Sequence, residues 1–557
     1  MPPDERRSLV LVPLLLLTPA MVGGIIRTTT GLALGPALAL GAVVAVLGAW
    51  AGARRFQGTP PTAWALAGAA LTATVAVYAL EIRAFDGLPS VGGGDAGNHI
   101  GNAVWFDGHS SRPYLQFVVF YALVGLVRRL TGSNLIVAFR IGWDLLLATI
   151  AWVAFAAAWI GARALRPAVR ATVAMLTALV IAWLTWLPLL GYDQADGFYS
   201  HLAGLTVVSL ALLCTSLPES RGWRLAALAA TPVILRFTYG LNLPDVLVGV
   251  ALLIWCESMG AAAPRLRWGL RVVAMGCLVA AAAAGHALWG LRAVEGAIVR
   301  PAHSAFVGSL VILVAALAWA LHRSVPGPRA RLLRAGLVFA GTTAAVQWGL
   351  LALKRPEAYY PVKHGFQALL IGTLAAGAIV ASAGRRTAGA LALSVGALIL
   401  ARASVQPYWR PYVERLRGSP PWRFLQPLSD PEALARIPRV LRTEQKTFGG
   451  YLDPSWPLAN AMNATLEFPG DWTVWDVGQR QFDSGGTIVG ATTCVFWSDA
   501  PGEDPAYQRL AGGFGQGTAK SRARLRALPD VRCADYRASW DGRVERRLCW
   551  HCGEPPD

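Results

Sequence analysis

The stretch AFRIGWDLLLATIAWVAF, residues 138–155, decides the fold of this 557-residue chain, because it is apolar over almost the length of a membrane span. It carries charge only at Arg140 and Asp144. A helix that crosses a bilayer needs about 20 predominantly apolar residues. On that rule we predict about thirteen transmembrane helices, near residues 9–26, 31–50, 62–81, 135–161, 171–189, 200–217, 225–239, 242–258, 271–290, 304–321, 335–353, 365–383 and 387–403.

The composition agrees with a polytopic α-helical membrane protein. Hydrophobic residues make up 55% of the chain and charged residues 15%, whereas a soluble chain carries about 25% charged residues. The net charge of +18 would suit a nucleic-acid ligand, but the arginines fall in short loops between apolar segments. Such clustering is typical of the cytoplasmic loops of membrane proteins. The sequence therefore predicts a membrane as partner and no nucleic acid.

The arginines also predict the orientation of the chain. Arginine clusters occupy every second loop, from the Arg6 pair to the Arg385 pair, and these loops should be cytoplasmic. The external loops are then residues 82–134, 190–199, 291–303 and 354–364, together with everything after Ala403. With an odd number of spans the N-terminus is cytoplasmic and the C-terminus is extracytoplasmic. We expect a multi-pass protein of the cell inner (plasma) membrane.

Two apolar segments need separate treatment. Residues 114–130, YLQFVVFYALVGLVRRL, would reverse the arginine pattern if they crossed the membrane. We therefore expect a helix that lies along the external membrane face. The turn RFTYGLNLPD, residues 236–245, places Arg236 and Asp245 close to lipid depth. A charge at that depth usually faces protein or a water-filled cavity.

From Ser404 the composition changes, and no later apolar run is long enough to cross a bilayer. We predict a transmembrane domain at residues 1–403 and a soluble extracytoplasmic α+β domain at residues 404–557. Within the second domain PEALARIPRVLRTEQ and PSWPLANAMNATLEF are typical of helices, whereas DWTVWDVG and GGTIVGATTCVFW are typical of strands.

The same region holds Cys494, Cys533, Cys549 and Cys552. Outside the cytosol four cysteines most simply form two disulfides, and the sequence leaves their pairing open. A zinc site built from CWHC, residues 549–552, with Cys533 and Cys494 is the alternative.

The first external loop holds the candidate catalytic acid. In SVGGGDAGNHIGNAVWFDGHSSRPYLQF, residues 90–117, Asp95 has glycines at positions 92–94 and 97, so the backbone can bend sharply and approach a ligand. A carboxylate above a membrane cavity could act as general base for an incoming hydroxyl. A solvated turn is the alternative. His99 follows four residues later as a candidate for binding the acceptor or the sugar.

The order of these segments resembles the C-type glycosyltransferase superfamily of integral-membrane enzymes that use polyprenyl-phosphate sugars. The resemblance is carried by a first external loop with an early acid, a helix with the Pro-Tyr start RPYLQF and the arginine-bearing span at 138–155. It implies that Asp95 is the catalytic base. The superfamily often shows paired acids at this place, whereas Asp95 is followed by Ala96. The resemblance covers about residues 62–403.

A second motif is similar to that of membrane arabinofuranosyltransferases. In KRPEAYYPVKHGFQ, residues 354–367, the pair Tyr359 and Tyr360 precedes Lys363 by three residues. The resemblance implies that Lys363 holds the donor phosphate, since a compact cation suits a phosphate oxygen. The two tyrosines would assist at the interface, where an ordinary belt of Tyr and Lys is the alternative.

Further charged residues fall on the same predicted face. Asp193 and Asp196 in LLGYDQADGFYSH, residues 189–201, could line an acceptor groove. They could also bind a divalent cation together with Asp95, or Asp196 could cap the helix that follows. Arg300 could help to bind phosphate, or it could anchor the end of a span. The pattern indicates no cofactor other than this possible divalent cation.

The resemblance implies an inverting transferase. A sugar would move from a polyprenyl-phosphate donor to an envelope glycan or lipid acceptor on the external face. The alternatives are a transporter or flippase of lipid-linked saccharides and a non-enzymatic assembly protein. Transporters tend to show internal repeats with interrupted spans, and we find no convincing repeat in the sequence.

Overall fold

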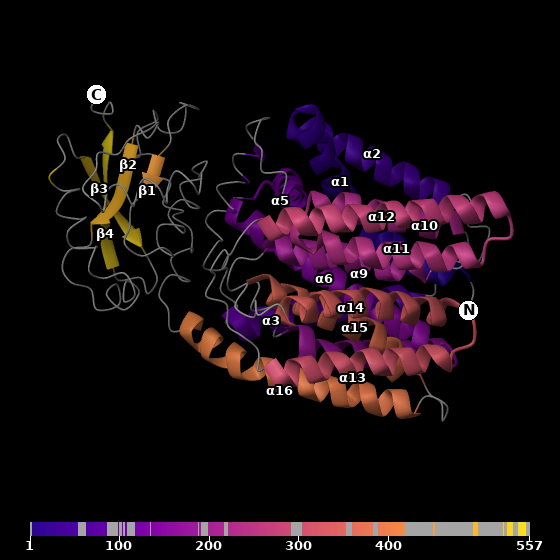
Figure 1. Cartoon of the computed structure of the whole chain (residues 1–557). Helices are drawn as coiled ribbons and strands as arrows, with labels where there is room; N and C mark the ends of the chain where they lie inside the picture. Colours follow the sequence, from indigo (N-terminus) through magenta and orange to yellow (C-terminus); the bar gives the residue numbers. More distant parts are fainter. Residues whose placement is uncertain are drawn as a thin grey trace.

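The computed structural model is predominantly helical, with a small sheet near the C-terminus (Figure 1). It describes residues 3–53, 63–85, 99, 103, 106–107, 117–133, 135–187, 189–190, 199–216, 221–290, 303–352, 359–382, 388–417, 449–451, 494–499, 527, 532–538 and 544–552.

The helices follow one another along the chain. They are α1 (Pro3–Thr30), α2 (Leu34–Ala53), α3 (Ala63–Phe85), α5 (Val118–Thr131), α6 (Leu135–Gly161), α7 (Pro167–Ile181), the π-helix η1 (Ala182–Trp186), α9 (Tyr199–Thr215), α10 (Arg221–Arg236), the 3-10 turn η2 (Gly240–Asn242), α11 (Leu243–Met259), α12 (Pro264–Gly290), α13 (His303–His322), α14 (Pro328–Ala352), α15 (Tyr359–Val380) and α16 (Ala388–Arg417).

Seven helices of the described part are long and apolar enough to cross a membrane. Four shorter apolar helices, at residues 34–48, 63–79, 199–215 and 388–404, coincide with further predicted spans. The predicted fold class, a polytopic helical membrane protein, is confirmed. The number of thirteen spans stays a prediction.

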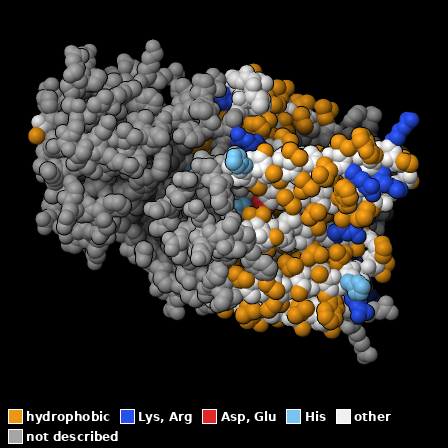
Figure 2. Space-filling view, in the orientation of Figure 1, with side chains coloured by type: hydrophobic (Ala, Val, Ile, Leu, Met, Phe, Trp, Pro, Cys, Tyr) orange, Lys and Arg blue, Asp and Glu red, His pale blue; other side chains and the backbone are white. Residues whose placement is uncertain are grey.

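Two helices form the centre of the bundle. The apolar window of α15 is almost wholly buried and most of that of α6 is buried, whereas α12 is mostly exposed. The exposed face of α12 carries Trp268, Val272 and Val279. Apolar side chains cover much of the bundle surface in Figure 2. In lipid such a surface needs no further partner, so α12 belongs at the periphery.

The two central helices touch through small residues. A Cβ atom added to Gly161 of α6 would collide with the backbone of Ala378 in α15. Where α15 meets α14, a Cβ atom at Gly336 of α14 would collide with the Cβ atom of Ala375. Small residues at helix contacts allow the close packing that holds helices together in membranes. This packing fixes the position of α15, which carries the predicted phosphate-binding motif.

Helix α5 lies at one end of the bundle, beside α1 and α6 (Figure 1). It is not among the candidate spans. Nine of its residues, including Phe120 and Tyr121, are buried by the rest of the chain. The helix therefore buries most of its apolar side chains against protein. Its position along the external membrane face stays a prediction.

The sheet has the strand order β1-β2-β4-β3. Its strands are β1 (Gly449–Tyr451), β2 (Cys494–Asp499), β3 (Arg532–Ala538) and β4 (Val544–Cys552). Strand β1 pairs in parallel with β2, and the other two pairings are antiparallel. Strand β2 lies inside the predicted segment GGTIVGATTCVFW. The two helices and the strand DWTVWDVG predicted in this region lie outside the described residues, and the domain boundary stays a prediction.

The register of the sheet predicts how the four cysteines pair. Cys494 lies opposite Cys552, and Cys533 lies opposite Cys549. Directly opposite positions on antiparallel strands have Cα atoms about 4.5–5.5 Å apart, which is within the range of a disulfide. Cys549 and Cys552 are three residues apart on β4, so their positions fall on opposite faces of the sheet. That arrangement disfavours one zinc site shared by all four cysteines.

We expect two disulfides, Cys494–Cys552 and Cys533–Cys549. Peptide mapping of the protein without reduction should recover one linked fragment for each pair. Reduction before digestion should release all four cysteines as free thiols and provides the control. A linkage between Cys494 and Cys533, or four thiols that bind zinc stoichiometrically, would contradict the pairing.

Candidate functional site

The predicted site residues differ in how far the structure describes them. His99 and Lys363 are described with their side chains. Tyr359 and Tyr360 form the start of α15, and only their backbone is described. The remaining predicted residues, Asp95, Asp193, Asp196 and Arg300, lie outside the described residues.

His99 is buried in a cluster of aromatic rings. Its Nδ1 atom is 3.0 Å from the hydroxyl oxygen of Tyr121. The ring centroids of Phe117 and Tyr199 lie 5.3 Å and 5.8 Å from that of His99, both in edge-on contact. Tyr121 belongs to α5 and Tyr199 opens α9, so His99 joins the first loop to the ends of two helices.

Lys363 reaches the same aromatic cluster from α15. Its Nζ atom lies 5.3 Å from the ring centroid of Tyr239, within the range of a cation–π contact. The Tyr239 ring stacks on Phe117, with 6.3 Å between the centroids. Phe117 therefore contacts both His99 and Tyr239, and it links the first loop to the start of α15. The two predicted residues with described side chains thus belong to one cluster.

Phe117 adopts an unusual backbone conformation. Its φ angle is 79°, and it is the one non-glycine residue of the described chain with a positive φ. Such a conformation costs free energy and persists only where the surroundings enforce it. The Phe117 carbonyl accepts hydrogen bonds from the amides of Phe120 and Tyr121, and the amide of Val119 donates to the Phe237 carbonyl at 3.4 Å. These bonds fix the start of α5 against the end of α10.

The first loop is also anchored beyond His99. Asp107 forms an ion pair with Arg129 of α5. Arg27 of α1 donates to the Asp107 carbonyl at 3.2 Å, and its guanidinium lies 5.0 Å from the Phe106 ring centroid. The described end of the loop is therefore tied to α1 and α5. Asp107 has a structural partner, so it is a weaker candidate for catalysis than Asp95.

The surroundings of His99 keep its imidazole neutral. Burial, and to a smaller extent the positive charge of Lys363, lower the pKa of His99 from 6.5 to about 3. A neutral imidazole can donate one hydrogen bond and accept another. Near neutral pH His99 can therefore bind a hydroxyl group without adding charge beside Lys363.

This neutral histidine makes the fold sensitive to acid. As the pH falls below 6.5 the unfolded chain protonates this imidazole, whereas the folded chain does so only near pH 3. The unfolded state then binds more protons, so stability falls with pH in this window. At pH 5 this one group should destabilise the fold by about 2 kcal/mol relative to pH 7.5.

Thermal unfolding in detergent at pH 7.5 and pH 5 tests this effect. His99→Gln should lose less stability than wild type between the two pH values. His286→Gln, which changes an exposed histidine of α12, is the matched control and should behave as wild type. An equal loss for wild type and His99→Gln would contradict the prediction.

A second buried polar group lies where α11, α14 and α15 meet. One carboxylate oxygen of Asp245, Oδ2, accepts hydrogen bonds from Thr343 Oγ1 and Gln367 Nε2, both at 2.7 Å. Asn242 donates to Gln367 Oε1. His364 Nδ1 lies 3.6 Å from the same Asp245 oxygen. Within a bundle of apolar helices, a charged group with this many partners is typical of a functional site.

Several atoms of this group lack a hydrogen bond among the described residues. They are Asp245 Oδ1, Asn242 Oδ1 and His364 Nδ1, all buried. Buried polar atoms almost always have a partner in proteins, so atoms without one point to water or to a ligand. Tyr239, Asn242 and Asp245 are spaced three residues apart on one turn, which connects this group to the aromatic cluster.

The sequence indicated part of this second group. The sequence places Asp245 close to lipid depth but indicates no specific role for it. The sequence analysis did not identify His364 and Gln367 as functional residues, although they lie three residues apart on the mostly apolar α15. That spacing, which places two polar side chains on one helix face, is the signal that could have found them.

No set of three His, Cys, Asp or Glu residues in the described part of the chain could hold a metal ion. The three acids of the predicted cation site, Asp95, Asp193 and Asp196, lie outside the described residues. A divalent cation at those acids stays an untested alternative.

Comparison with known proteins gives a likeness of fold. No family model and no curated protein matches the chain. Among solved structures, one match is the Archaeoglobus fulgidus oligosaccharyltransferase tethered with an acceptor peptide that contains the NVT sequon. The match has a TM-score of 0.38 and 13% sequence identity, and it covers 83% of this chain and 72% of that one. The same protein in complex with Zn and sulfate matches with a TM-score of 0.37 and 13% identity, over 82% and 71%.

A likeness at this TM-score and identity assigns neither a family nor an activity to the chain. It identifies neither a donor nor an acceptor, and it does not indicate arabinofuranosyltransferase specificity.

Proposed function

We propose that this chain is a membrane glycosyltransferase that moves a sugar from a polyprenyl-phosphate donor to an envelope glycan or lipid acceptor. One observation carries the proposal: three segments that the sequence predicts as functional meet at one aromatic cluster. His99 comes from the first loop, Tyr199 follows the acidic segment 193–196, and Lys363 comes from the motif at the start of α15.

In this proposal Lys363 binds the donor phosphate. A lysine ammonium is a compact charge that suits a phosphate oxygen. Its burial beside the Tyr239 ring keeps water away, so it would stabilise the negative charge that develops on the leaving phosphate. Tyr359, Tyr360 and Arg300 are proposed to help to hold the same phosphate.

Asp95 is proposed to act as the base. An acceptor hydroxyl oxygen attacks the anomeric carbon, and its proton passes to the Asp95 carboxylate. The bond between the anomeric carbon and the phosphate oxygen breaks, and the lipid phosphate leaves with the electron pair. A single displacement of this kind inverts the anomeric configuration. Asp95 precedes the described His99 by four residues, so the base and the aromatic cluster belong to one short segment.

The acceptor is proposed to bind between the first loop and the start of α9. The His99 imidazole can exchange hydrogen bonds with sugar hydroxyls, and the Tyr199 hydroxyl has no hydrogen-bond partner among the described residues. Asp193 and Asp196 precede this tyrosine and would extend the groove. Such polar groups beside aromatic rings are common in sugar-binding sites because rings stack on the sugar and hydrogen bonds orient it.

The test is transfer of labelled sugar from a panel of polyprenyl-phosphate donors in proteoliposomes that contain the full chain. We expect a labelled product with at least one donor and none with empty liposomes. Failure across the panel, together with movement of a lipid-linked saccharide between leaflets, would replace the transferase by a transporter.

A further inference from the structure

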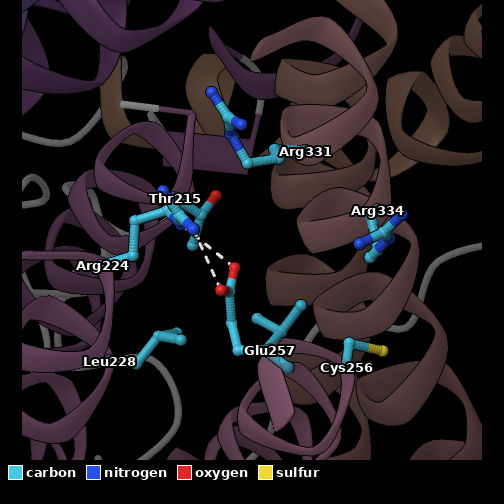
Figure 3. Close-up of a pocket in the computed structure, with 8 residues that line it drawn as sticks. Thr215, Arg224, Leu228, Cys256, Glu257, Arg331 and Arg334 are labelled. Atoms are coloured by element: carbon cyan, nitrogen blue, oxygen red, sulfur yellow. Dashed lines mark hydrogen bonds and ion pairs between the residues drawn. The ribbon is translucent and has the colours of Figure 1, made fainter. Parts of the chain in front are cut away.

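The two acids of α11 are held in different ways. Glu257, near the C-terminal end of the helix, accepts hydrogen bonds from Arg224 on both carboxylate oxygens, at 3.0 Å and 2.9 Å (Figure 3). This two-point pair satisfies the acid by itself. Asp245, in the first turn of the helix, is buried and accepts hydrogen bonds from uncharged donors of two other helices. A buried carboxylate is costly unless its partners stabilise it, so these contacts indicate a specific role for Asp245.

Asp245 joins α11 to both of these helices through one oxygen atom. Its Oδ2 atom accepts hydrogen bonds from Thr343 Oγ1 of α14 and from Gln367 Nε2 of α15, both at 2.7 Å. Gln367 Nε2 also donates to Thr343 Oγ1 at 3.0 Å. An acid in the first turn usually stabilises its own helix through the helix dipole. That role needs no partner on another helix, whereas Asp245 has one on each of two.

The turn between α10 and α11 contacts α15 at two levels. At the first level Tyr239 lies against the Lys363 ammonium, with 5.3 Å between Nζ and the ring centroid. At the second level Asn242 donates to Gln367 Oε1, and Asp245 accepts from Gln367 Nε2. Lys363 and Gln367 are four residues apart, so they lie on one face of α15. The two levels together fix this turn against α15 in height and in rotation.

The position of the Lys363 ammonium depends on its contacts, because lysine carries its charge on a flexible four-carbon stem. Lys363 is buried, and the Tyr239 ring beside it stacks on Phe117. A shift of the turn would move the Tyr239 ring and with it the surroundings of the ammonium. Stabilisation of a developing charge requires precise placement, so such a shift would weaken a phosphate ligand.

We propose that Asp245 is a positioning residue for the donor-phosphate site and acts through Lys363. Its hydrogen bonds to Thr343 and Gln367 hold the turn against α15. The turn holds the Tyr239 ring, and this ring holds the Lys363 ammonium. The effect of Asp245 on sugar transfer rests on the proposed function, in which Lys363 binds the donor phosphate. Its effect on the position of Lys363 does not depend on that function.

Chemical labelling of lysine amines reports on Lys363 without any substrate. Brief reductive methylation of the full chain in detergent, followed by peptide mass spectrometry, gives a separate labelling rate for each of the four lysines. Lys363 is buried and should react slowly in wild type. Asp245→Leu removes the acceptor for Thr343 and Gln367, so labelling of Lys363 should become about tenfold faster. The labelling rate of Lys446 serves as the internal reference.

Two variants separate positioning from a general loss of structure. Asp245→Asn keeps a carbonyl oxygen for the two donors, so Lys363 should be labelled nearly as slowly as in wild type. Glu257→Gln removes the other acid of α11 and should leave the labelling rate of Lys363 unchanged. Equal acceleration by Asp245→Leu and Glu257→Gln, or the wild-type rate in Asp245→Leu, would overturn the proposal. If Asp245→Leu fails to fold, Gln367→Met replaces it with the same two outcomes.

Transfer kinetics then test whether Asp245 acts through Lys363. Asp245→Leu should lower kcat/KM for the donor about tenfold. In a Lys363→Met background the same change should lower kcat/KM by less than about twofold, because residues that act through one another are not additive. An equal loss in both backgrounds would overturn the proposal. Faster labelling of Lys363 with unchanged kcat/KM would support its positioning by Asp245 and would exclude Lys363 as the phosphate ligand, so the two failures are distinguishable.

Discussion

Replacing Asp95 with asparagine is expected to lower the rate of sugar transfer by about 10²–10⁴-fold, the usual contribution of a general base. Asparagine has nearly the same shape as aspartate, but its amide does not accept the proton of the acceptor hydroxyl. Binding of the donor should change little, because Asp95 is proposed to act on the acceptor. Initial rates of labelled-sugar transfer in proteoliposomes, at equal protein levels, measure the effect.

Asp107→Asn provides the matched control, since Asp107 belongs to the same loop. Its ion pair with Arg129 is partly exposed to solvent, and such pairs contribute little to stability. Transfer by this variant should stay within about twofold of wild type. A large loss in both variants would mean that the loop had lost its structure. Normal transfer by Asp95→Asn would exclude Asp95 as base and point to Asp193 or Asp196.

The sequence predicted the membrane-embedded parts of the helices better than their ends. The predicted span 135–161 coincides with α6, Leu135–Gly161. By contrast α14 begins at Pro328, well before the predicted residue 335, because its first turns carry Arg329, Arg331 and Arg334. Hydropathy detects the part of a helix that suits lipid, whereas arginine is a good helix former and extends the helix beyond it.

The sequence predicted a site residue only where that residue belongs to a recognisable short motif. Lys363 and His99 stood out in short polar motifs, but the contact between their surroundings depends on how α5, α10 and α15 pack. Thr342 and Thr343 show the limit. Thr342 bonds to the Val338 carbonyl of its own helix, whereas Thr343 donates to Asp245 on another helix. Both are threonines in one apolar helix, so their sequence does not separate these roles.

Replacing Lys363 with methionine is expected to lower kcat/KM for the donor about 10–100-fold, through a lower kcat as well as a higher KM. Methionine keeps an unbranched apolar stem against Tyr239 and removes the cation, and a hydrogen bond to a charged group contributes about 1.5–3 kcal/mol. Lys363→Arg keeps the charge and should retain part of the activity. Lys354→Met, in the same predicted loop, is the control and should behave as wild type. Transfer kinetics at varied donor concentration separate the two constants.

The same variant has a consequence that does not depend on activity. The charge of Lys363 helps to lower the pKa of His99, so Lys363→Met should raise that pKa. The folded chain would then bind a proton on His99 at a higher pH, and the loss of stability between pH 7.5 and pH 3 would become smaller. Lower kcat/KM together with a smaller pH effect would place the cation beside both the donor phosphate and His99. Lower kcat/KM with the wild-type pH effect would mean that Lys363 binds the donor without affecting His99. An unchanged kcat/KM would exclude Lys363 as the phosphate ligand, and Arg300 would then be the next residue to test.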